Sequence, residues 1–194
     1  MLPSRSEAEQ LLRESEKLNP GPWGDHSRVV ARCAERIALE CGMDAEKAYI
    51  VGLLHDIGRR FGVKHLAHVA DGYSYMLFKG WDEAARICLT HSFNNGTVEE
   101  YIGRFDVTDE ELGMLRAALA SVEMDDYDRL IQLCDSVADA RGVVDIEERM
   151  GDVKRRYGRY PLPKWNKNLE LKALFETKMG KDLYTVIGRS SPQK

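Results

Sequence analysis

The sequence has no hydrophobic run that approaches the roughly 20 apolar residues needed to cross a bilayer. Its N-terminal segment, MLPSRSEAEQLL, is polar and acidic and lacks the apolar core of a signal peptide. The four cysteines form no CxxC pair, and all but Cys41 lie in apolar helical patterns. We therefore expect a cytoplasmic protein without a membrane partner, whose cysteines are reduced and mostly buried.

Strand-like alternation, internal repeats and low-complexity segments are also missing. What remains is a succession of helical patterns separated by breaks such as NPGPWG (19–24). Ser6 with Glu9 is expected to cap the first helix, and Asp44 the third. Helices are predicted over 4–18, 26–42, 45–58, 65–80, 82–93, 108–122, 126–142, 146–158 and 167–188. No interior linker marks a boundary, so we expect an all-α helical bundle that forms a single domain over residues 1–194.

The net charge of −4 argues against a dedicated nucleic-acid-binding protein. The charge is unevenly distributed along the chain. Residues 95–140 contain 12 acidic and 3 basic side chains, whereas residues 141–181 contain 11 basic and 6 acidic ones. Two interpretations remain open: two solvated faces of opposite sign, or a basic wall beside an anion site.

Histidine is scarce, with five residues, and its placement is informative. In GLLHDIGRR (52–60), His55 and Asp56 end an apolar helical run, and Gly58 is expected to let the chain turn away. Asp135 lies in the middle of another apolar run, LIQLCDSVA. Buried polar groups are costly unless they are paired. One bound cation would compensate them together, because Mn, Fe, Co and Zn accept mixed imidazole and carboxylate ligands. These residues predict a metal site in the core of the bundle.

The order His26, His55-Asp56, Asp135 resembles the H…HD…D signature of the HD-domain superfamily, which consists of all-helical metal-dependent phosphohydrolases. The similarity covers about residues 20–142 and leaves 143–194 as a helical C-terminal extension. Within the superfamily, a subgroup with two metals carries one additional histidine in an H-x-x-x-G context and another on the next helix. HVADG (68–72) and LTHSF (89–93) resemble these two motifs.

The resemblance implies six metal ligands. His26, His55 and Asp135 would hold one divalent transition metal, His68 and His91 a second, and Asp56 would bridge them. Iron is the first choice of metal, with Mn, Co, Ni and Zn as alternatives. His65 competes with His68 for the fourth position; His68 is preferred for its spacing to a glycine.

The resemblance also implies a reaction and its substrate contacts. A metal-activated hydroxide would attack phosphorus, with Asp56 orienting it or accepting its proton. Arg59, Arg60, Lys64 and Arg141 follow the ligands in sequence and are candidate phosphate contacts. The substrate would be a small phosphate ester or anhydride, in the first place a nucleotide, with dinucleoside polyphosphates included.

The sequence departs from the family in three places. Arg59 stands where lysine is common after HDIG. The GYP triplet of the cyclic-dinucleotide-cleaving branch has no counterpart, which argues against that branch. Arg141 matches an arginine of small HD proteins that cleave diadenosine tetraphosphate, but Ala138 replaces the acidic residue that accompanies it.

Two alternatives stay open at the level of sequence. The same six ligands support mixed-valent di-iron oxygenases, and a non-catalytic nucleotide-binding regulator would retain the fold. The complete ligand set argues against the regulator. The sequence is silent on oligomeric state and leaves a homodimer open.

Overall fold

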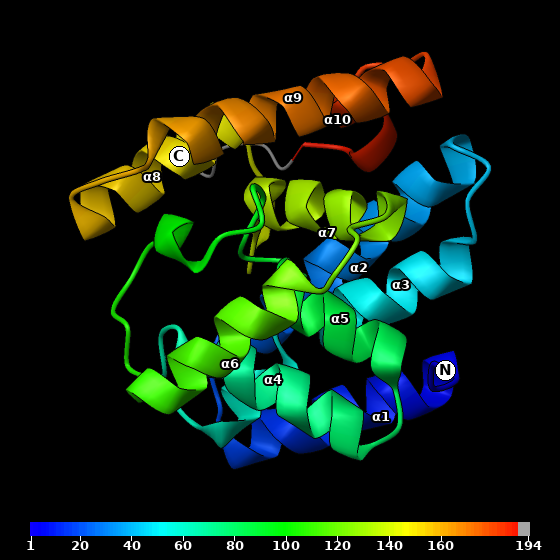
Figure 1. Cartoon of the computed structure of the whole chain (residues 1–194). Coiled ribbons are helices and arrows are strands. Elements are labelled where there is room, and N and C mark those ends of the chain that lie inside the picture. The colour runs from blue at the N-terminus through cyan, green and yellow to red at the C-terminus, as the bar shows by residue number, and fades with distance from the viewer. Residues whose placement is uncertain (190–194) are drawn as a thin grey trace.

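The computed structural model describes residues 1–189, and this part of the chain is almost entirely helical (Figure 1). The α-helices are α1 (Arg5–Leu18), α2 (Trp23–Glu40), α3 (Ala45–Leu54), α4 (Ala67–Phe78), α5 (Asp82–Thr90), α6 (Asp109–Ala120), α7 (Asp126–Val137), α8 (Ile146–Tyr157), α9 (Leu162–Met179) and α10 (Leu183–Ile187). Two 3-10 helices, η1 (Ile57–Phe61) and η2 (Val98–Glu100), and two short strands, β1 (Ala138–Asp139) and β2 (Gly142–Val143), complete the described elements. The prediction of an all-α fold is confirmed.

The core is built around α2, and each of its two faces packs into a different hydrophobic cluster. One face packs with α7 and α9 through residues such as Ile37, Leu130 and Phe175. The other meets α1, α3 and α5, with Ala31, Leu53 and the rest of a second cluster. Figure 1 shows α8 and α9 lying over α7, on the side of the bundle opposite to α1 and α4. The C-terminal extension therefore shares its core with the helices of the HD-like region.

Several helix boundaries differ from the prediction. The first helix is capped by Ser4 and Glu7, not by Ser6 and Glu9. The pattern Ser-x-x-Glu occurs twice in this segment, and sequence alone does not rank the two. The cap by Asp44 is confirmed, since its side chain accepts a hydrogen bond from the Lys47 N–H.

Three of the predicted helices are divided. The helix predicted over 45–58 ends at Leu54 and is followed by η1. The helix predicted over 126–142 ends at Val137, and β1 and β2 form a tight antiparallel hairpin after it. The helix predicted over 167–188 begins earlier, at Leu162, and is interrupted at Gly180, whose φ of 63° lies in the left-handed region. Glycine adopts this conformation without a steric cost, which is why it ends helices.

The cysteines are free, and three of the four are buried. Among residues 1–189, no helix combines the length and the apolar character that a membrane span requires.

Candidate metal centre

The HDIG segment marks the place where α3 stops. The helix ends at Leu54, His55 still has helical backbone angles, and Asp56 departs from them before η1 begins. The two side chains are nearly inaccessible, at 1% and 4% exposure. Because the chain leaves the helix between them, adjacent residues reach different partners.

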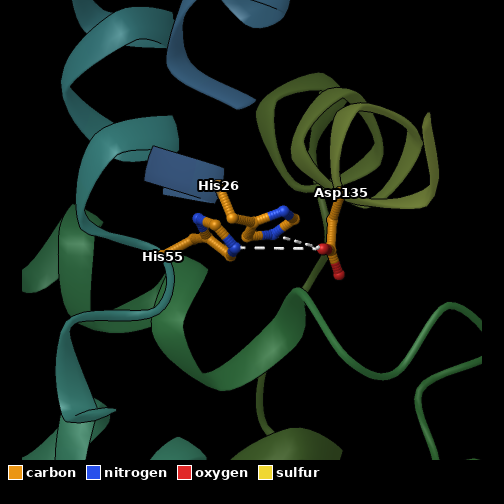
Figure 2. A group of neighbouring side chains, drawn as sticks. All are labelled: His26, His55 and Asp135. Carbon is orange, nitrogen blue, oxygen red and sulfur yellow. Dashed lines mark ion pairs between the residues drawn. The ribbon is translucent and has the colours of Figure 1, made fainter. Parts of the chain in front are cut away.

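His26, His55 and Asp135 form one group of possible metal ligands (Figure 2). The Nε2 atom of His26 lies 2.9 Å from Asp135 Oδ1, and that of His55 lies 4.0 Å from the same oxygen. These side chains come from α2, the end of α3 and α7. Asp135 is one-third exposed rather than deep in the core, because it faces a cavity described below.

Asp56, His68 and His91 form a second, fully buried group. The Nε2 atoms of His68 and His91 lie 3.0 and 3.6 Å from Asp56 Oδ1, and 3.4 Å from each other. His68 stands in the first turn of α4, and His91 follows the last residue of α5.

The carboxylate of Asp56 lies between the two groups. Its Oδ1 faces His68 and His91, while its Oδ2 lies 3.9 Å from His55 Nε2. Oδ2 also accepts a hydrogen bond of 2.5 Å from Arg59 Nε. The rings of His55 and His91 are 5.1 Å apart between centroids, so the two groups are contiguous.

Main-chain carbonyls hold three of the imidazole rings. The Nδ1 of His55 lies 2.8 Å from Gly52 O, that of His91 lies 2.9 Å from Cys88 O, and that of His68 contacts His65 O. A carbonyl oxygen accepts a hydrogen bond only from a protonated Nδ1, which leaves Nε2 of the neutral ring with its lone pair toward the cluster. His65 thus contributes its backbone, and its own ring packs near Tyr157, outside both groups.

Two atoms of the centre lack any hydrogen-bond partner although they are buried: His55 Nε2 and Asp56 Oδ1. An unsatisfied buried polar atom costs about 1–3 kcal/mol. Both atoms are of types that bind divalent transition metals, and both point into a group of such atoms. The residues present therefore fit a bound cation.

Electrostatics favours the protonation states that metal binding requires. Burial raises the pKa of Asp56, but the positive charge of Arg59 outweighs it and holds that pKa well below its usual range. Burial also raises the pKa of Asp135, but the hydrogen bond with His26 outweighs burial and lowers that pKa below its usual range. Burial and the adjacent His55 ring lower the pKa of His91 to about 3. The carboxylates are ionised and the His91 imidazole is neutral at pH 7.

The centre opens into a cavity of about 830 Å³. Arg59 and Arg141 line this cavity, as all the candidate ligands except His55 do. Arg60 and Lys64 do not line it. The guanidinium of Arg60 lies over the Tyr75 ring, 4.3 Å from its centroid, and donates to the Tyr75 hydroxyl. Lys64 forms an ion pair of 2.7 Å with Asp71.

The opposite wall of the cavity comes from α8, α9 and the segment between them. Arg149, Arg156 and Lys164 line it together with Tyr157 and Tyr160. The excess of positive charge over 141–181 was the sequence signal for this wall. Of the two interpretations of that charge, the structure favours a basic wall beside an anion site over two solvated faces. The sequence did not indicate which basic residues face the cavity, because that depends on how α9 packs over α7.

The comparisons with known proteins agree with this architecture. A family model described as the HD domain matches residues 23–140. The fold is similar to the HD domain of the L. monocytogenes phosphodiesterase PgpH, with a TM-score of 0.50 and 18% identity over 88% of this chain and 97% of that one. The structure of that domain in complex with cyclic-di-AMP gives a TM-score of 0.49 and 16% identity over 95% and 100% of the two chains. No curated protein matches the sequence. Since the family model covers more than half of the chain, the protein belongs to the HD-domain family of metal-dependent phosphohydrolases.

Proposed function

We propose that this protein hydrolyses a nucleotide, or another small phosphate ester or anhydride, with two divalent metals bound at adjacent sites. One observation carries the proposal. Two groups of ligand atoms meet at the Asp56 carboxylate, on the floor of a cavity whose other walls carry cations. A protein that only had to satisfy buried polar groups would not need a second set of ligands beside the first.

The chain offers six ligands in all: four would reach the first metal and three the second, because Asp56 would be shared between them. His26, His55 and Asp135 would hold the first metal. Asp56, His68 and His91 would hold the second, and Asp56 Oδ2, 3.9 Å from His55, would reach the first. Iron is the first choice of metal through the family resemblance, and Mn, Co, Ni and Zn are alternatives because they also accept imidazole and carboxylate ligands.

When bound, such metals lower the pKa of water and neutralise charge on phosphate oxygens. The remaining work belongs to the chain's own side chains. In the hydrolysis a water oxygen forms a bond to phosphorus, the bond from phosphorus to the leaving oxygen breaks, and that oxygen takes up a proton. Asp56 would orient the attacking water, and Arg59 holds the carboxylate in position by donating a hydrogen bond to it. The proton that the water loses balances the one that the leaving oxygen takes up.

The cavity fits a substrate of nucleotide size. Its volume of about 830 Å³ lies in the range of small-molecule sites, roughly 300–1,000 Å³. Aromatic side chains also line it: Trp23, Tyr101, Tyr157 and Tyr160. Aromatic rings provide stacking surfaces for nucleobases. Arg59 and Arg141 supply guanidinium groups, which match phosphate oxygens in a bidentate geometry.

The test combines metal analysis with a substrate screen. Protein purified without added metal is analysed for transition metals and then assayed for hydrolysis of nucleotides and dinucleoside polyphosphates, with released phosphate and nucleotide products both measured. We expect about two metals per chain and hydrolysis that a chelator abolishes. His55→Ala and Asp56→Ala should lose both metal and activity. Two irons with substrate-dependent oxygen uptake and no hydrolysis would contradict the proposal and identify an oxygenase.

A further inference from the structure

Lys164 differs from the other basic side chains of the cavity. Arg59, Arg141, Arg149 and Arg156 each lie within 4.0 Å of a carboxylate, which is Asp56, Asp139 or Asp152. Within residues 1–189, Lys164 is the only lysine or arginine of the cavity lining without such an ion pair. Its ammonium group donates a hydrogen bond to the carbonyl oxygen of Ser92.

This hydrogen bond places the ammonium group beside the metal centre. Ser92 follows His91 directly and, like His91, lines the cavity. Lys164 comes from α9, beyond the 23–140 region that matches the family model. The C-terminal extension therefore delivers a basic side chain to the cavity wall beside His91, within the influence of the Asp135 and Glu100 carboxylates.

The position of Lys164 is fixed by a buried network one turn further along α9. Asn168 is 1% exposed and accepts a hydrogen bond of 2.8 Å from Asn94, in the loop after α5. Its own amide donates to the Tyr160 hydroxyl at 2.7 Å. Residues four apart on a helix share a face, so the contact that anchors Asn168 also holds Lys164 toward the cavity.

A cation held in a partly buried site without a carboxylate partner is costly unless an anion binds to it. A lysine that only stabilised the packing of α9 would be expected to pair with an acidic residue, as Lys167 and Lys172 do on the same helix. The Lys164 ammonium has three N–H donors, and its hydrogen bond to the Ser92 carbonyl uses one of them. They face a cavity that already offers metal ligands on its floor.

We propose that Lys164 forms a phosphate subsite in the wall of this cavity, and that its ammonium group binds a non-bridging oxygen of the phosphoryl group held at the metal centre. The proposal rests on the proposed function in taking the bound anion to be the phosphoryl group of a substrate. Binding of inorganic phosphate by Lys164 does not depend on catalytic turnover. It assigns to α9 a direct role in the site: the C-terminal extension completes the substrate pocket.

The test measures binding of inorganic phosphate to the metal-loaded protein by isothermal titration calorimetry. Lys164→Met should retain its metal and its far-UV circular dichroism, but bind phosphate at least about tenfold more weakly, the loss expected for one charge-assisted hydrogen bond. Lys164→Arg should recover part of the affinity. Lys167→Met is the matched control, because Lys167 lies on the same helix, does not line the cavity, and pairs with Glu170.

Equal phosphate affinity in wild-type protein and in Lys164→Met would overturn the inference. If Lys164→Met loses its metal, Lys164→Gln is compared in the same way, and a metal-loaded glutamine variant with wild-type affinity would be equally decisive. The proposed function fails separately. If wild-type protein binds metal and phosphate but hydrolyses none of the substrates tested, the proposed hydrolysis is wrong. Weaker phosphate binding by Lys164→Met would still support the subsite in that case.

Discussion

The backbone of Gly58 lies so close to α4 that a Cβ atom there would come within 1.9 Å of the His68 carbonyl oxygen and 2.5 Å of the Gly72 nitrogen. Gly58 does not have a positive φ. The glycine of HDIG is therefore required by this close approach and not by a special turn of the chain. The contact brings η1 against α4, and with it Asp56 against His68.

Gly58→Ala should consequently destabilise the protein and disturb the centre. The methyl group would force two backbone segments apart, and overpacking of this kind costs about 3 kcal/mol. For a chain of this size that corresponds to a fall in Tm of roughly 6–12 °C. Differential scanning calorimetry of the metal-free protein measures the stability, and metal analysis measures the loss of His68 as a ligand.

Gly113→Ala is the control for this experiment. Gly113 lies inside α6, and a Cβ atom added there would meet nothing within 4 Å. Because alanine favours a helix interior by about 1 kcal/mol over glycine, the control should be slightly more stable than wild type. A Gly58→Ala protein as stable as this control would show that the close approach is not a constraint.

Three of the proposed ligands are signalled locally in the sequence, whereas the full set of six was assigned through the resemblance to the HD-domain family. His55 and Asp56 end an apolar run, and Asp135 interrupts another, so their type conflicts with their surroundings. Local spacing also explains why the imidazoles are oriented as they are: His55 and His68 turn Nδ1 to a carbonyl three residues earlier. Such contacts need only the helical backbone and no knowledge of the fold.

The basic side chains that α8 and α9 contribute to the cavity wall could not be predicted in the same way. Lys164, Lys167, Lys172 and Lys178 are all basic residues of α9, and only Lys164 lines the cavity. Which face of α9 turns inward is decided by Leu171 and Phe175 packing against α2 and α7, far away in sequence. Arg60 and Lys64 illustrate the opposite case. They are close to His55 and Asp56 in sequence, but they do not line the cavity.

His68 and His65 compete for one ligand position, and separate substitutions distinguish them. His68→Ala should lose one of the two metals, because its Nε2 is part of the second group of ligands. His65→Ala should retain both, since only its backbone carbonyl contacts the His68 ring. Metal analysis of the two purified variants measures this. Loss of metal from His65→Ala, with full occupancy in His68→Ala, would reverse the assignment.

Asp106 should stabilise the start of α4 in a pH-dependent manner. The N-cap of this helix, Leu66, has no capping side chain, and Asp106 accepts hydrogen bonds from the N–H groups of His65 and Ala67 instead. Burial raises the pKa of Asp106, but these backbone hydrogen bonds outweigh it and lower the pKa. Its contribution is therefore complete above the unfolded-state pKa of about 3.9 and is lost as the pH falls through the lower folded-state value.

Asp106→Ala should accordingly cost about 1 kcal/mol at pH 7, the typical value of a helix cap. Urea unfolding of the metal-free proteins at pH 7 and near pH 3 measures the difference from wild type, which should shrink at the lower pH. Glu110→Ala, at an exposed position in the first turn of α6, should change stability much less. A difference between Asp106→Ala and wild type that grows on acidification would exclude the proposed cap.

Arg141 and Arg60 are both candidate phosphate contacts by sequence, and the structure predicts opposite outcomes for them. Arg141 lines the cavity and its side chain is 85% exposed, so the guanidinium is free to leave its partner Asp139 for a substrate. Arg141→Ala should leave both metals bound and raise KM by about tenfold, the effect of losing one charged hydrogen bond.

Arg60 is engaged with Tyr75, so Arg60→Ala should keep its KM and lose about 0.5–1 kcal/mol of stability from the cation–π contact. Steady-state kinetics of phosphate release, with metal content measured for each variant, separates these outcomes. A raised KM in Arg60→Ala and an unchanged one in Arg141→Ala would mean that the substrate approaches the Asp56 carboxylate from the η1 side, outside the cavity.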